Sequence, residues 1–176
     1  LFLAAGIIDH QTGTRQIDKL GGLLRSMPAT AFAATAACLS MAGFPLFFGF
    51  IGKEIMYKGA LAETLCPELA VTAAVLANAL MTAVGGILIV RPFLGRAGAY
   101  DRTVREAPAV MWAGPVILGC VGIAFGIIPD WVGRWLVEPA VHAFHSTTEP
   151  VHLALFHGIN EPLLLSILTL TLGIAF

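Results

Sequence analysis

The sequence has 176 residues, of which 57% are hydrophobic and 12% are charged, and its formal net charge is −1. A soluble domain carries about 25% charged residues, so this composition is too apolar to cover a water-facing surface and favours a lipid bilayer as solvent. The near-neutral charge excludes the strongly basic surface that nucleic-acid binding requires.

Uncharged runs separated by polar loops predict the membrane spans in chain order. A helix needs about 20 apolar residues to cross a hydrocarbon core about 30 Å thick. The predicted spans are the tail of a helix at 1–8, a broken span at 28–62, then 69–91, 108–128 and a truncated span at 160–176. The expected fold is therefore all-α, a polytopic transmembrane helical bundle. Because the first span is only a tail, we interpret residues 1–176 as one partial membrane domain of a longer protein.

The charges of the loops predict the orientation of these spans. Lysine and arginine dominate the loops 9–25 and 91–106, whereas the loop 53–68 balances its lysines with glutamates and the loop 130–161 holds only Arg134. Short loops rich in lysine and arginine favour the cytoplasm. We expect the first and third loops inside and the second and fourth outside.

The stretch 129–145 predicts a short helix after the fourth span. Trp131 and Trp135 lie four residues apart, which places them on one helix face. Tryptophan is enriched at the membrane–water interface. We expect an interfacial helix here, and a site for an aromatic ligand is the alternative.

The span at 28–62 contains residues that disfavour a straight helix. As one helix, residues 28–53 would extend about 39 Å, which exceeds the hydrocarbon core. Pro45 lacks an amide proton and clashes with the preceding turn, while Gly43 and Gly49 tolerate dihedral angles that other residues resist. A break at Gly43–Gly49 would leave Lys53 within the membrane, as in transporters with discontinuous helices. The alternative is a straight, tilted helix with Lys53 at the outer interface.

A lysine at membrane depth is a candidate for ion or proton transport. Its charge costs about 2.5–3.5 kcal/mol there, so such residues tend to be functional. Burial disfavours the charged form of a lysine, which allows a proton to be taken up and released near neutral pH. The adjacent Glu54 could tune Lys53, although sequence neighbours do not share a helix face and Glu54 is better placed to pair with Lys58.

Several stretches carry a resemblance to a known family. They are GIIDHQTGTRQIDKLGGLLRSMPATAF at 6–32 and LSMAGFPLFFGFIGKE at 39–54. Both resemble the large antiporter-like subunits shared by Mrp-type monovalent cation/proton antiporters and respiratory complex I. The loop 9–15 and LALFHGINEPLLLSILTLTLG at 153–173 are more similar to the A subunit of the Mrp type, where Trp is usual at the position of Phe156.

The resemblance implies a fold, a role for Lys53 and a set of partners. The family core contains two inverted repeats, each with a broken helix, and lysines, histidines and carboxylates carry protons across the membrane. The lysine that ends the GFxxK motif, here Lys53, lies on the second broken helix. A subunit of a multi-subunit Na⁺/H⁺ antiporter of the bacterial inner membrane is implied, with other Mrp subunits as partners and no bound cofactor. It would be a transporter rather than an enzyme. The alternative is a proton-pumping subunit of a complex I-type NADH:quinone oxidoreductase or membrane hydrogenase.

His157, just before the last span, is a further candidate for the proton or ion path. Histidine titrates near neutral pH, and an ordinary interfacial residue is the alternative. Asn160 is suited to cap the last helix. His142, His145 and His152 fit no zinc motif, so we expect no metal site.

Other polar side chains suggest local roles. We expect Asp9 to pair with Arg15 in a solvated loop. The polar groups inside the span 69–91 are Thr72, Asn78 and Thr82. Such groups in membrane helices more often bridge neighbouring helices than bind ions.

Overall fold

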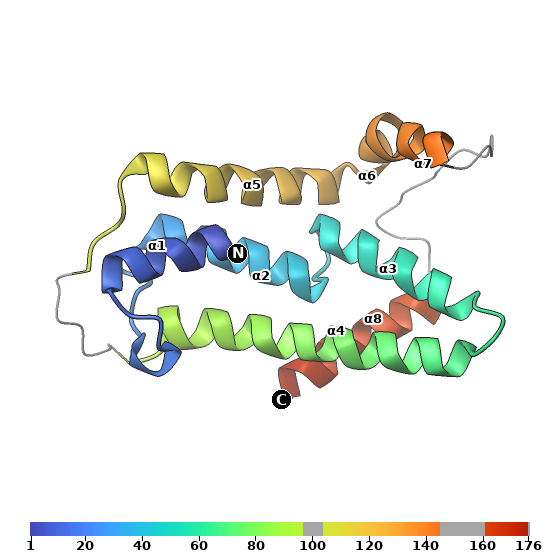
Figure 1. Ribbon diagram of the computed structural model, residues 1–176, viewed down its shortest axis with the longest axis horizontal. Coiled ribbons are helices and arrows are strands. Elements are labelled where there is room, and N and C mark those ends of the chain that lie inside the picture. The colour runs from blue at the N-terminus through green and yellow to red at the C-terminus, as the bar shows by residue number, and fades with distance from the viewer. Residues whose placement is uncertain (97–103, 145–160, 176) are drawn as a thin grey trace.

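The computed structural model describes residues 1–96, 104–144 and 161–175, and these contain helices and connecting segments but no strand (Figure 1). The α-helices are α1 (Phe2–Thr12), α2 (Pro28–Ala42), α3 (Phe48–Leu61), α4 (Pro67–Ile89), α5 (Ala109–Ile127), α6 (Pro129–Val132), α7 (Glu138–Phe144) and α8 (Glu161–Ala175). A 3₁₀ turn, η1 (Ile17–Lys19), and two π-helical segments, η2 (Val90–Leu94) and η3 (Gly133–Val137), complete the order.

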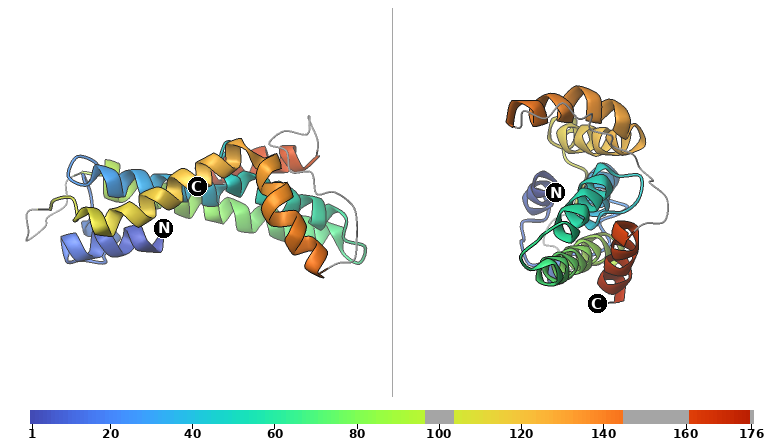
Figure 2. Two further views of the ribbon diagram at one scale, coloured as in Figure 1. Left: turned by 90° about the horizontal axis from the view of Figure 1, so that it is seen from above. Right: turned by 90° about the vertical axis from the view of Figure 1, so that its right-hand side faces the viewer.

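Helices α1 to α5 lie with their long axes in roughly the same direction, and α8 crosses beside α4 (Figures 1 and 2). Helix α2 packs against α1, α4 and α5, while α8 packs against α4 and α3. The segment from α6 to α7 follows α5 and runs across the direction of the other helices (Figure 2). Its Trp131 and Trp135 side chains are exposed.

The first and third loops meet at one end of the molecule. Arg91 forms an ion pair with Asp18, and the amide of Leu23 donates to the carbonyl of Pro92 at 3.1 Å. The connection between α3 and α4 lies at the opposite end (Figure 1). The two loops that are rich in lysine and arginine therefore share one side of the bundle.

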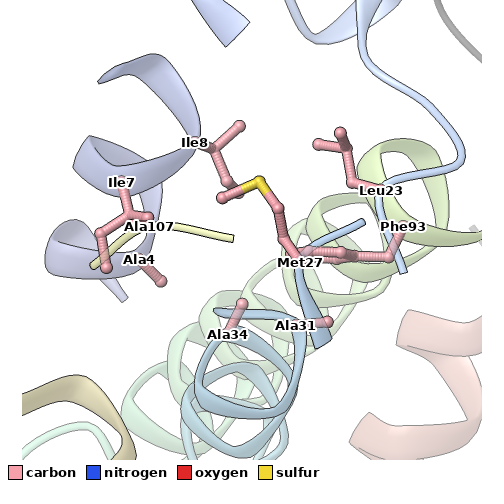
Figure 3. Close-up of a cluster of buried hydrophobic side chains, with 9 residues drawn as sticks. All are labelled: Ala4, Ile7, Ile8, Leu23, Met27, Ala31, Ala34, Phe93 and Ala107. Carbon is pink, nitrogen blue, oxygen red and sulfur yellow. The ribbon is translucent and has the colours of Figure 1, made fainter. Parts of the chain in front are cut away.

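A cluster of buried side chains packs at the end that holds these two loops (Figure 3). Its members come from α1, the first loop, α2, η2 and the segment before α5, and they are Ala4, Ile7, Ile8, Leu23, Met27, Ala31, Ala34, Phe93 and Ala107. Alanine lets helices approach closely, which favours packing between helices in a membrane.

Large apolar side chains cover the outside of the helices. Pro67–Leu94 and Ala109–Ile127 are long and apolar enough to cross a membrane, and Pro28–Ala42 and Glu161–Ala175 are shorter apolar helices. Only Gly126 of α5 is buried. In α8 the buried positions are Pro162, Ser166, Thr169 and Gly173, while the leucines and isoleucines face outward or are half-buried. An apolar outside with polar groups inside is typical of a helix bundle in lipid.

Two helices extend beyond the ranges expected from the sequence. Helix α1 continues through Asp9 to Thr12 and ends at Gly13, whose φ of 71° is the left-handed conformation that often closes helices. Helix α4 passes into η2 and reaches Leu94, although Pro92 has no amide to donate. The wider π turn accommodates this missing donor.

Candidate functional site

The helix break lies between α2 and α3. Helix α2 ends at Ala42, and Gly43 adopts left-handed angles of φ 69° and ψ 43°. The amide of Gly43 donates to the carbonyl of Ser40 at 3.0 Å, and the amide of Phe44 donates to that of Leu39 at 2.9 Å. These two hydrogen bonds form a Schellman motif, the common way in which a helix ends at a left-handed glycine. Pro45 is exposed in the connection that follows.

The last carbonyl of α2 accepts two side-chain hydrogen bonds. Nζ of Lys53 donates to the carbonyl oxygen of Ala42 at 3.0 Å, and Oγ1 of Thr82 approaches the same oxygen at 3.4 Å. Lys53 is only 5% exposed. The final carbonyls of a helix have no partner within the helix and carry a partial negative charge. The break therefore creates the acceptor that holds the Lys53 ammonium.

Two glycines make room for this arrangement. A Cβ atom on Gly43 would lie 2.5 Å from Cδ of Lys53, and its positive φ would be strained in any other residue. A Cβ atom on Gly49, in the first turn of α3, would clash with the carbonyl oxygen of Ser40. Glycine at both positions lets the ends of α2 and α3 touch, so that Lys53 reaches back to α2.

Glu54 follows Lys53 in α3 and is 3% exposed. Sequence neighbours on a helix point in different directions, so Glu54 and Lys53 face different parts of the interior. Lys58, one turn further along, is exposed. The pairing of Glu54 with Lys58 stays a prediction.

A cavity of about 550 Å³ adjoins Lys53. Its lining includes Ser40, Gly49, Gly52 and Asn78 together with apolar residues of α1, α2 and α5. A water molecule occupies roughly 30 Å³ in the liquid, so the cavity has room for several. Lys53 thus lies between the end of a helix and a mostly apolar space with a few polar groups in its lining.

Polar residues of the span 69–91 have different partners. Oγ1 of Thr82 approaches α2 as described, which confirms the predicted bridge between helices. The amide of Asn78 donates to the carbonyl of Ala74 at 2.8 Å within its own helix. The hydroxyl of Thr72 likewise donates to the carbonyl of Glu68 at 2.6 Å, as threonine and asparagine often do in helices.

Buried hydroxyl groups on α3 and α8 were missed by sequence reasoning. Tyr57 is 0% exposed and lies one helical turn after Lys53, and Ser166 and Thr169 are 1% and 0% exposed on α8. The four-residue spacing from Lys53 to Tyr57 was a usable signal, because such residues share a helix face. No local signal predicts which face of α8 is buried.

Glu106 also escaped the sequence reasoning, although it binds the other end of α2. Its carboxylate accepts hydrogen bonds from the Ala29 amide at 2.7 Å and the Thr30 hydroxyl at 2.7 Å. Free amides and a partial positive charge at a helix N-terminus favour such a carboxylate. Helix α2 is thus held at one end by Glu106 and at the other by Lys53.

Three further sequence predictions concern His157, Asn160 and the pair of Asp9 with Arg15. His157 and Asn160 lie outside the described residues. The predicted pair of Asp9 and Arg15 is confirmed, with 2.9 Å between Oδ2 and Nε, and it lies in an exposed position away from Lys53.

The fold and the break define a polytopic helical membrane protein with a discontinuous helix, which confirms the predicted fold class. Residues 1–82 match the family described as NADH:quinone oxidoreductase/Mrp antiporter, TM.

Relatives and a solved structure extend this similarity along the chain. The A subunit of the Na⁺/H⁺ antiporter of Alkalihalophilus pseudofirmus is 35% identical over 99% of this chain and 24% of the relative. The A/B subunit of a probable K⁺/H⁺ antiporter of Rhizobium meliloti is 40% identical over 99% of this chain and 18% of the relative. A chain of the Mrp complex from Dietzia sp. DQ12-45-1b superposes with a TM-score of 0.73 at 30% identity, over 99% of this chain and 19% of that one.

These matches confirm the predicted resemblance to the antiporter-like superfamily and, within it, to the A subunit of Mrp-type antiporters. The chain spans about a quarter or less of the length of these relatives.

Proposed function

We propose that this chain is part of a subunit of a multi-subunit Na⁺/H⁺ antiporter, in which it provides a segment of the transmembrane proton path. The observation that carries the proposal is the buried Lys53 ammonium at the broken end of α2, 3.0 Å from the carbonyl of Ala42. Helix α2 has 15 residues and so is about 22 Å long, less than the hydrocarbon core. A membrane crossed by α4 would therefore hold this end of α2 at depth.

Lys53 can serve as a proton carrier because opposing interactions act on its charge. Burial opposes the ammonium form, whereas the helix end and its carbonyl favour it. A proton that leaves Lys53 removes the attraction to Ala42, and a returning proton restores it. The adjoining cavity offers a space from which water could deliver or accept that proton. Glu54 and His157 are proposed as further groups of the path.

The surroundings of this subunit follow from its charge distribution and its relatives. The end with the first and third loops would face the cytoplasm of a bacterial cell, because those loops are rich in lysine and arginine. The membrane is proposed to be the bacterial inner membrane. Other Mrp subunits are the proposed partners, and Na⁺ and H⁺ the transported ions.

The test is Na⁺-driven proton movement in everted membrane vesicles that contain the full-length parent with its partner subunits. We expect Lys53→Ala to lose at least about 90% of the exchange rate, as expected when a proton carrier in a transfer path is removed. Lys58→Ala is the matched control, since Lys58 is exposed on the same helix. Normal exchange by an equally abundant Lys53→Ala complex would overturn the role of Lys53.

The same vesicles distinguish the alternative of a redox-driven proton pump. The family that matches residues 1–82 includes subunits of NADH:quinone oxidoreductase. An antiporter moves protons in response to a Na⁺ gradient alone. Proton movement that requires NADH and quinone, and that ignores Na⁺, would contradict the antiporter and favour the pump.

A further inference from the structure

Helix α8 presents its polar side to the interior. Its four buried residues are spaced by three or four positions and so share one face. They are Pro162, Ser166, Thr169 and Gly173. A Cβ atom on Gly173 would clash with Thr82, which shows how closely α8 approaches α4. A membrane helix that hides hydroxyl groups from lipid places them against polar neighbours or water.

Two hydroxyl groups on this interior surface have no hydrogen-bond partner among the described residues. They are the hydroxyl of Tyr57 on α3 and Oγ of Ser166 on α8, whose residues are 0% and 1% exposed. The side chains of Thr169 and Asn78 lie near the Tyr57 hydroxyl without forming a hydrogen bond of ordinary geometry to it. A buried hydroxyl without a partner is costly, and bound water commonly satisfies such groups.

Tyr57 and Asn78 each lie one helical turn from a residue that approaches the Ala42 carbonyl. Tyr57 follows Lys53 by four residues in α3, and Asn78 precedes Thr82 by four residues in α4. The Thr82 hydroxyl donates to the carbonyl of Asn78 at 2.9 Å and lies 3.4 Å from the Ala42 carbonyl, which Lys53 binds. A polar surface thus runs from the broken end of α2 between α3, α4 and α8.

We propose that Tyr57, Asn78, Thr169 and Ser166 line a hydrated proton path that continues from Lys53 along α8. The inference rests on the proposed function, because Lys53 must first carry a proton. A hydroxyl can accept one hydrogen bond and donate another. When a water or Lys53 transfers a proton to one side of a hydroxyl, that hydroxyl releases its own proton to the next water. Each group is unchanged after the transfer, and one proton has moved.

The first test removes single hydroxyl groups in the full-length protein with its partner subunits. We expect Tyr57→Phe and Ser166→Ala each to lower Na⁺-driven proton exchange about five- to tenfold, the ratio that corresponds to the loss of roughly one hydrogen bond. Thr171→Ala is the matched control, since its hydroxyl is on the exposed face of α8 and donates to the carbonyl of Leu168. The control should exchange at the normal rate.

The second test measures water access without relying on transport. Ser166→Cys and Thr171→Cys are made in the full-length protein after Cys38, Cys66 and Cys120 are replaced by alanine, and both are treated with a small, charged methanethiosulfonate. A hydrated path predicts modification of the cysteine at 166 and none at 171, because 171 lies on the outer, mostly apolar face of α8. Equal protection of both cysteines would overturn the path, and so would unchanged exchange in Tyr57→Phe and Ser166→Ala.

The two tests separate this inference from the proposed function. If Lys53→Ala stops exchange while the hydroxyl variants exchange normally, Lys53 carries the proton and the path along α8 is wrong. If Lys53→Ala exchanges normally, the proposed function itself fails.

Discussion

Glycine and proline occur close together at 43–45 and at 114–115, and of these two pairs only the first breaks a helix. In the first, Gly43 and Pro45 separate α2 from α3. In the second, Gly114 and Pro115 lie inside α5, which continues to Ile127. The same residue types therefore have opposite effects on two apolar helices.

The difference lies in the backbone and in the partners of the freed carbonyl groups. Gly43 adopts a left-handed conformation, and the carbonyl of Ala42 has Lys53 and Thr82 as donors. Gly114 has no positive φ, and the space around it is open. Proline removes one donor and crowds one carbonyl, which α5 tolerates. Helix α2 therefore ends within an apolar run because Gly43 turns the chain and polar side chains approach the carbonyl oxygen at its end.

The largest effect is expected from Gly43→Ala. Alanine at this position would be strained by the positive φ, and its Cβ would displace the Lys53 side chain. We expect Na⁺-driven exchange to fall at least about tenfold. Gly114→Ala is the matched control and should leave exchange unchanged, because nothing lies within 4 Å of its new Cβ. Equal exchange by both variants would show that the glycine at the break has no special role.

A smaller loss is expected at the other end of α2. Glu106→Ala removes the acceptor of the Ala29 amide and the Thr30 hydroxyl, which should lower the free energy of unfolding by about 1–2 kcal/mol. The comparison is Glu68→Ala, an exposed carboxylate in the first turn of α4, which should cost about 0.3–1 kcal/mol. Unfolding of the purified complex in denaturing detergent measures both. A Glu106 variant as stable as the parent would contradict the capping role.

Thr82→Val should have a still smaller effect. It leaves Lys53 as the remaining side-chain donor to the Ala42 carbonyl, so we expect a loss of about 0.5–1.5 kcal/mol in the free energy of unfolding. Thr72→Val is the control, because Thr72 is exposed and bonds only within its own helix. The same detergent unfolding compares the two variants, and a greater loss from Thr72→Val would argue against the bridge.

The smallest effect is expected from Pro45→Ala. Pro45 is exposed, and the left-handed Gly43 and its hydrogen bonds close α2 without it. The variant should retain more than about half of the exchange rate and lose at most about 1 kcal/mol of stability, mainly because proline restricts the unfolded chain. Loss of exchange on the scale of Gly43→Ala would mean that proline, rather than glycine, maintains the break.

The prediction that the fold is all-helical succeeded because apolar runs of membrane length are local features that composition reveals. The antiporter-like resemblance was likewise confirmed, since its motifs are contiguous. The roles of Lys53, Glu54 and His157 stay predictions. The partners of the two ends of α2 were harder to predict: Glu106 binds its first turn from 76 residues away, and the Thr82 hydroxyl approaches the Ala42 carbonyl from 40 residues away.

The sequence alone determined that this chain forms apolar helices, that a Gly-Pro stretch lies before Lys53, and that basic residues gather in two loops. These follow from short-range rules, because helix length, dihedral freedom and loop charge depend on neighbouring residues. The tertiary structure decided which carbonyl Lys53 meets and which face of α8 is buried. Both depend on how α2, α3, α4 and α8 pack, and residues far apart in the chain set that packing.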